Sequence, residues 1–238
     1  MADTHSIITP AIMYWGTPVA LITTLNKDGT PNIGPISSVW WLGHRCILGL
    51  ASGSQTTMNL LRTKTCVINL ASDDMARYIN PIAKTTGTPT VPPGKKGRGY
   101  KHCNDKFRLS GLTHQESDLV QPPRITECPV QMEAEFMNSM ELMQDLPDRK
   151  GLLLALEVKI LRTHVRNDLR LAGHANRIDP DRWKPLIMSF QHFYGLTPSK
   201  VAESSLATID EEKYRVITRS DDVKQGGDMD EVNGLEKS

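Results

Sequence analysis

The residues best suited to chemistry form the stretch SGSQTTMNL, residues 52–60, which follows an apolar run. A helix beginning here would direct free backbone N–H groups and a partial positive charge away from its first turn. The hydroxyls of Ser52, Ser54, Thr56 and Thr57 would add small hydrogen-bond donors. This combination suits a phosphate group. The alternative is an ordinary N-cap at Ser54, because Ser and Thr are common at helix starts.

A second polar stretch, NIGPISS at residues 32–38, interrupts a strand pattern just before two tryptophans. A strand that only filled a core would not need Asn32, Ser37 and Ser38 at these positions. Backbone and side-chain hydrogen-bonding groups here could follow the edge of a flat heteroaromatic ring. The alternative is the rim of a barrel with buried tryptophans nearby.

Residues 85–103, TTGTPTVPPGKKGRGYKHC, show no hydrophobic period and predict a long loop. Loops of this length are often functional lids, although an ordinary mobile insertion would look the same. Basic residues in and just after this loop could attract a phosphate-bearing ligand, and a solvated loop would have the same composition. They are Lys95, Lys96, Arg98, Lys101 and Lys106.

Other kinds of chemistry have no visible pattern. The four cysteines, at positions 46, 66, 103 and 128, include no CxxC pair, and the histidines show no HxxxH or HExxH spacing. We therefore expect no metal site and no structural disulfide. The chain has no GxSxG motif and no paired carboxylates with telling spacing, so hydrolysis is not supported.

The elements that must position these residues are mostly strands. Asn26 to Gly29 predicts a hairpin turn, Ser54 the start of a short helix with an apolar face of Met58, Leu60 and Leu61, and residues 73–84 a helix ending near Pro81. The six strong strand patterns cover residues 18–25, 30–40, 45–51, 65–70, 128–140 and 151–165. This order favours a mainly β fold, a closed or partly closed antiparallel barrel with peripheral helices. Alternating βαβ units and GxGxxG are absent, which argues against a Rossmann domain.

The composition is that of an ordinary globular protein. The chain has 238 residues, 39% of them hydrophobic, and a net charge of +1, so neither nucleic acid nor an anionic membrane is the expected partner. The N-terminus lacks the pattern of a signal peptide, and no run is long enough to span a membrane, so we expect a cytoplasmic protein. We expect one domain over residues 1–207, followed by a charged and partly disordered tail over 208–238.

Four blocks in this order resemble the flavin reductase-like family, the FMN-binding split barrels, over roughly residues 8–207. The second block contains Ser54, Thr56, Asn59 and Leu60 in the family pattern S-x-T-x-x-N-L followed by a strand. The blocks are YWGTPVALITTLNKDGTPNIGPISSVWWLG (14–43), LGLASGSQTTMNLLRTKTCVINL (48–70), KFRLSGLT with PPRITECPVQMEAEF (106–113 and 122–136), and ANRIDPDRWKPLIMSFQHFYGL with SSLA (175–196 and 204–207).

The resemblance implies a six-stranded Greek-key barrel that forms a homodimer, with FMN, rather than FAD, bound noncovalently near the interface. The hydroxyl-rich helix start would hold the phosphate, and residues 32–38 would line the isoalloxazine. The implied cofactor-binding residues are Asn32, Pro35, Ile36, Ser37, Ser38, Ser52, Ser54, Thr56, Thr57 and Asn59. His192 and Tyr194 are candidates for the outer face, where NAD(P)H would donate a hydride, and the loop at 85–106 could close over the donor.

The implied activity is that of an FMN-dependent oxidoreductase of the flavin reductase type, which takes a hydride from NADH or NADPH. Three departures from typical two-component reductases argue against a simple partner reductase for a monooxygenase. Residues 183–196 lack the usual Gly-rich ending with Arg or His before Tyr, the 85–105 insertion is long, and a tail extends beyond residue 208. The alternatives are an FMN flavoprotein that acts directly on a small molecule, or a flavoredoxin-like electron carrier.

Overall fold

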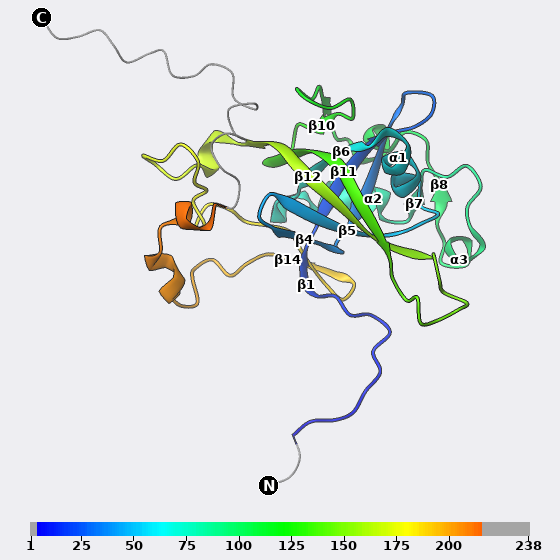
Figure 1. The fold of residues 1–238 in the computed structure, drawn as a ribbon, viewed down its shortest axis with the longest axis horizontal. Coiled ribbons are helices and arrows are strands. Elements are labelled where there is room, and N and C mark those ends of the chain that lie inside the picture. Colours follow the sequence, from blue (N-terminus) through cyan, green and yellow to red (C-terminus); the bar gives the residue numbers. More distant parts are fainter. Residues whose placement is uncertain (1–3, 216–238) are drawn as a thin grey trace, which may run out of the picture.

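The computed structural model describes residues 4–215, and its main feature is one antiparallel sheet (Figure 1). Seven strands are ordered β3-β2-β6-β11-β12-β5-β4. Their bounds are Ala20–Leu25 (β2), Pro31–Ile36 (β3), Val39–Leu42 (β4), Arg45–Ala51 (β5), Thr65–Leu70 (β6), Val130–Glu141 (β11) and Leu153–Val165 (β12). The mainly β fold predicted from the sequence is confirmed.

The sheet curls into a split barrel because its two edge strands are neighbours in sequence. β3 and β4 stand at opposite ends of the strand order, yet only Ser37 and Ser38 separate them. The amide of Gly49 in β5 donates to the carbonyl of Ser38 at 2.8 Å, which ties this crossing to the far edge. The single strand predicted for residues 30–40 is therefore two strands on opposite edges, and the sheet has seven strands where six were expected.

The barrel has apolar residues on both faces. Ala20 and Ile22 of β2 belong to the core inside the barrel, while Leu21 points to a second core that includes Met75 and Ile79. Successive residues of a strand face opposite sides, so both sides of β2 are covered. This explains why its sequence is continuously apolar rather than alternating.

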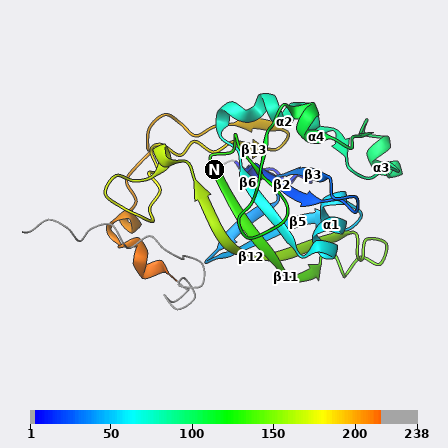
Figure 2. The ribbon, with the colours of Figure 1, turned by 90° about the horizontal axis from the view of Figure 1, so that it is seen from above.

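Helices cover the outer face at one side of the barrel, where α2 and α4 lie close together (Figure 2). The helix bounds are Gln55–Thr63 (α1), Asp73–Met75 (η1, a 3₁₀ turn), Ala76–Ala83 (α2), Pro93–Lys96 (α3) and Lys106–Ser110 (α4). Pro81 lies inside α2 instead of ending it. A proline removes one backbone donor, and the fully buried Ile82 in the following position anchors the last turn in the core.

The buried face of α1 differs from the predicted one. Met58 is 43% exposed, whereas Thr56, Thr57, Asn59 and Leu60 are buried. Of the predicted apolar face, Leu60 is buried and Leu61 packs against the barrel core, and only Met58 is misplaced. Polar groups of the β2–β3 hairpin provide hydrogen bonds to the inward face of this helix, so its burial does not follow hydrophobicity alone.

The segment 85–103, predicted as a long loop, has a short parallel pair of strands at its two ends. β7 (Thr85–Thr86) pairs with β8 (Lys101–His102), and α3 lies between them. The two ends of this segment therefore lie side by side on the barrel, which its composition alone did not indicate.

Smaller elements complete the described chain. β1 (Trp15–Pro18), β13 (Ile187–Ser189) and β14 (His192–Tyr194) form a three-stranded sheet, and β9 (His114–Gln115) pairs with β10 (Arg124–Ile125). Three 3₁₀ turns follow at Asn167–Leu169 (η2), Ser205–Thr208 (η3) and Glu211–Tyr214 (η4).

The first residues of the predicted tail, 208–215, are described and contain η4, whose N-cap Asp210 pairs with Arg177 at 2.5 Å. The remainder of the tail, 216–238, lies outside the described residues. All four cysteines are free thiols. Within residues 4–215, no helix combines the length and the apolar character needed to cross a membrane.

Candidate functional site

An open pocket of about 190 Å³ lies beside the free edge of β3, and we refer to it as the edge pocket. Its walls come from five places in the sequence: the end of β3, the end of β5, the start of α1, the segment 83–87, and the region of Lys95 to Lys106. The lining residues are Gly34, Pro35, Ile36, Leu50, Ala51, Ser54, Gln55, Thr56, Ala83, Thr85, Thr86, Gly87, Lys95, Tyr100 and Lys106.

Close packing of β3 against α1 shapes one wall of the edge pocket. A Cβ atom added at Gly34 would lie 2.3 Å from Oγ1 of Thr56. A Cβ atom at Gly87 would similarly lie 2.6 Å from Oδ1 of Asn32. Both positions therefore require glycine for close approach, and the chain can bring strand, helix start and the 83–87 segment together only because these side chains are absent.

The start of α1 supplies hydrogen-bond donors to the edge pocket. Ser54 is the N-cap, and its Oγ accepts a hydrogen bond from the amide of Thr57 at 3.1 Å. The amides of Gln55 and Thr56 precede the first hydrogen bond within the helix, so they are free to bind a ligand. The hydroxyl of Thr57 donates to the carbonyl of Ala51 at 2.8 Å, which fastens the helix start to the end of β5.

Beneath the helix start lies a buried network of uncharged polar groups. Nδ2 of Asn32 donates to Oγ1 of Thr56 at 3.2 Å and to Oγ1 of Thr24 at 3.4 Å. Nδ2 of Asn59 donates to the same Thr24 hydroxyl at 3.2 Å and to Oδ1 of Asn26 at 2.9 Å. These bonds hold α1 in a fixed position against the β2–β3 hairpin, so the donors at its N-terminus are preorganised.

Two lysines add positive charge to the edge pocket. Lys106 is only 4% exposed, and its Nζ donates to the carbonyl of Ile33 at 2.6 Å. Burial lowers the pKa of Lys106 to about 8; nearby Cys103 raises it and Lys95 lowers it further. Lys95 is half-buried, and its pKa is also lowered, first by burial and then by the charge of Arg98. An anion bound here would meet ammonium groups that little water screens.

The residues present therefore fit a ligand that has both a phosphate and a flat ring. Helix amides, the Ser54 hydroxyl and the two lysines suit the phosphate. Pro35, Ile36 and Leu50 provide an apolar wall beside the edge of β3. In the described part of the chain β3 pairs with β2 alone, so part of its backbone is available to the polar edge of a ring.

The residues predicted to bind the cofactor fall into two groups. Pro35, Ile36, Ser54 and Thr56 line the edge pocket. The others, Asn32, Ser37, Ser38, Ser52, Thr57 and Asn59, are not among its lining residues; Asn32, Thr57 and Asn59 support it from the buried side.

Ser37, Ser38 and Ser52 lie at junctions. Ser37 and Ser38 make the crossing from β3 to β4, and Oγ of Ser38 lies 3.1 Å from the hydroxyl of Tyr14. Ser52 is half-buried, and its amide donates to the carbonyl of Leu152 at 3.0 Å. All three stay predictions as ligand contacts.

His192 and Tyr194, the outer-face candidates, lie on β14 and are exposed. Neither lines the edge pocket, so within one copy of residues 4–215 the structure does not bring them to this site. Of the five basic residues noted in the sequence, only Lys95 and Lys106 reach it. Sequence reasoning missed Gln55, Gly87 and Tyr100 because nothing in their local pattern indicates that distant segments converge on them.

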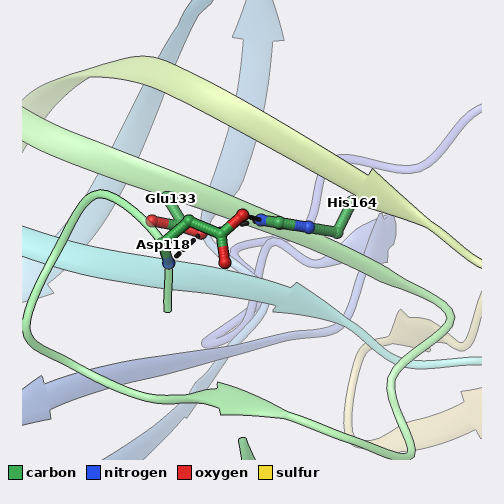
Figure 3. A group of neighbouring side chains, drawn as sticks. All are labelled: Asp118, Glu133 and His164. Carbon is green, nitrogen blue, oxygen red and sulfur yellow. Dashed lines mark hydrogen bonds and ion pairs between the residues drawn. The ribbon is translucent and has the colours of Figure 1, made fainter. Parts of the chain in front are cut away.

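A second polar cluster lies where β11 and β12 meet the loop at residue 118, and its members Asp118, Glu133 and His164 point toward one another (Figure 3). Glu133 is fully buried, and its carboxylate accepts hydrogen bonds from the amides of Asp118 at 3.0 Å, Leu119 at 2.6 Å and Val120 at 3.2 Å. Nε2 of His164 lies 2.7 Å from Oε1 of Glu133.

The spacing of this cluster would allow a metal ion, since one ligand atom from each residue lies within 4.8 Å of the others. The hydrogen bonds argue for a different role. Both Glu133 oxygens already accept backbone N–H groups, and Nη1 of Arg162 donates to Oδ2 of Asp118 at 2.7 Å. A cation here would have to displace these donors. No local pattern indicates the cluster, because its members lie 15 and 31 residues apart in the sequence.

Comparison with known proteins places these features in a family. Residues 13–197 match the family described as flavin reductase like domain. The uncharacterized protein YdfE of Bacillus subtilis (strain 168) is 41% identical over 189 residues, which cover 79% of this chain and 88% of that protein.

Solved structures show the same fold at low identity. The flavoredoxin of Desulfovibrio vulgaris (Miyazaki F) has a TM-score of 0.68 at 17% identity, covering 87% of this chain and all of that one. Nitrilotriacetate monooxygenase component B from Bacillus cereus has a TM-score of 0.67 at 18% identity, covering 84% of this chain and 100% of that one. The 2-nitrobenzoate 2-nitroreductase of Pseudomonas fluorescens has a TM-score of 0.59 at 17% identity, covering 79% and 88%.

Proposed function

This chain belongs to the flavin reductase-like family, and on that premise we propose that it is an NAD(P)H-dependent flavin oxidoreductase that binds FMN in the edge pocket. The observation that carries this proposal is the convergence on one pocket of free helix amides, a buried lysine and the edge of β3. These groups match the two ends of FMN, a phosphate monoester and a heteroaromatic ring with a polar edge.

The phosphate would lie at the start of α1. The amides of Gln55 and Thr56 would donate to it, and the ammonium group of Lys106 would neutralise part of its charge. Lys106 is held in place by the Ile33 carbonyl, so little side-chain entropy is lost on binding. The ring would lie against Pro35 and Ile36, with the backbone of the β3 edge beside its polar side.

When bound, FMN supplies the redox chemistry, accepting a hydride from a nicotinamide and passing electrons on. The chain positions the ring, excludes water from its inner face with the apolar wall at Ile36 and Leu50, and leaves the other face open. Lys95 and Tyr100, from the segment that β7 and β8 close off, also line the pocket and would contact the incoming donor.

We also propose that the working form is a homodimer. Several large apolar side chains near the crossing from β3 to β4 are exposed, which is uncommon for a solitary barrel. Trp15 is 65% exposed, Trp40 is 55% exposed and Leu42 is 75% exposed. A second copy covering this surface would lie close to the strand that leads into the edge pocket. A sedimentation velocity experiment tests this, since a monomer at micromolar concentration would contradict it.

The first test is an absorption spectrum of the purified protein with added FMN, followed by anaerobic addition of NADH and then NADPH. We expect peaks at about 370 and 450 nm, characteristic of oxidised flavin, which bleach with at least one donor. A protein that binds no flavin would contradict the proposal. The variant Lys101→Met, whose lysine is exposed and outside the pocket, should behave as wild type, whereas Lys106→Met should bind FMN more weakly.

If bound flavin remains oxidised with both donors, the reductase activity is wrong and the alternatives apply. Direct bleaching by a small-molecule substrate would indicate a substrate-specific flavoprotein, and rapid reduction by a redox protein would indicate an electron carrier. The structural relatives include a flavoredoxin, a monooxygenase component and a nitroreductase, so the fold alone does not select the acceptor.

A further inference from the structure

The hairpin of β11 and β12 projects beyond the end of the sheet, and we refer to its outer part, residues 137–153, as the hairpin tip (Figures 1 and 2). The first residues of β11 are buried, whereas every residue from Met137 to Glu141 is exposed. Successive residues of a strand face opposite sides, so both faces of this part of β11 are open to solvent in one copy of the chain.

The hairpin tip exposes many large apolar side chains. They are Met137, Met140, Met143, Leu146, Leu152 and Leu153, each at least 40% exposed. In the described part of the chain, none of the six belongs to either hydrophobic core. Single exposed apolar residues are ordinary, but six in one hairpin tip are typical of an interaction surface. Methionine is enriched at protein interfaces because its flexible thioether adapts to the partner.

The backbone of the hairpin tip is ordered although no core supports it. The amide of Leu142 donates to the carbonyl of Leu153 at 2.9 Å, and the amide of Leu146 donates to the carbonyl of Met143 at 3.1 Å. Met143 has a φ of 59°, a left-handed conformation that costs energy in any residue except glycine. Such strain persists where surrounding contacts hold it, and a two-stranded ribbon alone is only marginally stable in water. We therefore expect a further contact to cover the tip.

The charges of the hairpin tip favour a second copy of this chain as that contact. Asp145 and Asp148 lie just before Arg149 and Lys150, and among residues 4–215 no ion pair involves any of these four side chains. Across a two-fold axis both copies present the same surface, so a residue pair formed in one direction is formed again in the other. The two acids of one tip can therefore face the two bases of the other, and a partner of single-sign charge could use only half of these groups.

The position of the tip separates it from the surface around Trp40. β12 and β5 lie between β11 and β4 in the strand order, and Trp40 is on β4. The base of the tip is instead next to the edge pocket, because Leu153 pairs with Ala51, which lines that pocket. A protein seated on the tip would therefore be a neighbour of the candidate cofactor site.

We propose that the hairpin tips of two copies pack against each other, with the methionine and leucine side chains at the centre and the charged residues paired at the rim. This interface is additional to the homodimer surface around Trp40. The two isologous interfaces together would assemble four copies with dihedral symmetry. The inference does not depend on flavin binding.

The first test is the molar mass of the full chain, measured by sedimentation velocity over a range of concentrations. Met140→Glu places a charge at the centre of the proposed contact, and we expect it to halve the molar mass, with a dissociation constant at least about tenfold larger. Leu206→Glu is the matched control, because Leu206 is 63% exposed, compared with 58% for Met140, and lies on η3, away from the hairpin. The control should have the wild-type mass, and circular dichroism verifies that both variants are folded.

A charge exchange tests whether the partner is a second tip. One variant combines Asp145→Lys with Asp148→Lys, and the other combines Arg149→Glu with Lys150→Glu. Each alone should dissociate as Met140→Glu does, because like charges then meet across the two-fold axis, whereas an equimolar mixture should regain the wild-type mass.

Three results would overturn this inference: a monomeric wild type, an unchanged mass in Met140→Glu, or a mixture of the two charge variants that stays dissociated. If the mass falls only in Trp40→Glu, the surface around Trp40 forms the assembly and the hairpin tips do not. Each of these results leaves FMN binding to be measured separately, so the proposed function is tested independently.

Discussion

Two regions of this barrel bury polar groups, and they differ in whether those groups are satisfied by the chain itself. Around Glu133, three backbone amides and His164 surround one carboxylate. At the edge pocket, the amides of Gln55 and Thr56 have no partner within the helix, and Lys106, whose ammonium donates one hydrogen bond to the Ile33 carbonyl, lines the same pocket. Around Glu133 the chain satisfies its own hydrogen-bonding groups, whereas at the edge pocket some donors remain for a ligand.

The difference separates a structural site from a binding site. A buried charge that is completely satisfied stabilises one conformation and offers nothing to a ligand. Glu133 ties β11 to residues 118–120 in this way. Preorganised donors beside a pocket have the opposite property, because the chain itself does not satisfy them and a ligand can. Changes in the two regions should therefore have separable effects on stability and on flavin binding.

The largest effect is expected for Glu133→Gln. An amide has one acceptor oxygen, and its NH₂ group would face backbone donors, so we expect a loss of about 3 kcal/mol in the free energy of unfolding. FMN affinity of the folded protein should change less than twofold. Urea denaturation and flavin titration measure the two effects. Glu135→Gln is the control on the same strand; its carboxylate forms a half-exposed ion pair with Lys159 at 3.3 Å, worth about 0.5 kcal/mol.

Low pH should show the contribution of the Glu133 carboxylate to the stability of the wild-type protein. Burial alone raises the pKa of Glu133, but the amides of Asp118 and Leu119, together with His164, lower it below the ordinary 4.5. The carboxylate therefore stabilises the fold above pH 4.5, and this stabilisation is lost as the pH falls through the lowered pKa. Glu133→Gln should show a flatter stability curve below pH 4.5. Parallel curves for the two proteins would mean that other carboxylates dominate acid unfolding.

Gly34→Ala should damage the binding region most. The added methyl group would lie 2.3 Å from Oγ1 of Thr56, so β3 and α1 must separate. We expect a stability loss of about 1 to 3 kcal/mol from overpacking and an FMN affinity at least about tenfold weaker. Gly53→Ala is the matched control, since a Cβ there meets nothing within 4 Å. Equal FMN affinity for both variants would show that the helix start does not hold the ligand.

The pH dependence of FMN binding should follow the protonation of Lys106. Its ammonium group loses its proton above a pKa of about 8, while a phosphate monoester is fully charged over this range. FMN affinity should therefore fall by about tenfold between pH 7 and pH 9. Lys106→Met should bind FMN about tenfold more weakly at pH 7 and show no such dependence. If FMN affinity still falls with pH in Lys106→Met, another group causes the pH dependence.

The smallest effect is expected at the N-cap. Ser54→Ala removes the acceptor of the Thr57 amide, and we expect a stability loss of about 1 kcal/mol with a few-fold weaker FMN binding. Ser52→Ala should be neutral for stability, because no side-chain hydrogen bond of Ser52 is present in the described structure. Thermal unfolding distinguishes the two. Equal losses would mean that Ser52 also caps the helix.

Much of the fold follows from local patterns. β5, β6 and the start of α1 lie where their β-branched runs and the Ser54 cap predict them, because these signals are contained within a few residues. The resemblance to the family rests on the same local blocks. Pro35, Ile36, Ser54 and Thr56 line the edge pocket, and their roles as cofactor ligands stay predictions.

The remaining features depend on contacts between distant segments. Ser37 and Ser38 look like part of a strand locally, but sheet closure makes them the crossing between its two edges. Lys106 looks like one of five loop cations until Ile33 binds it in the core. The charge, the hydrogen-bonding capacity and the helix start were determined by sequence. Which donors are satisfied and which remain for a ligand was decided by tertiary structure, since that depends on what packs beside them.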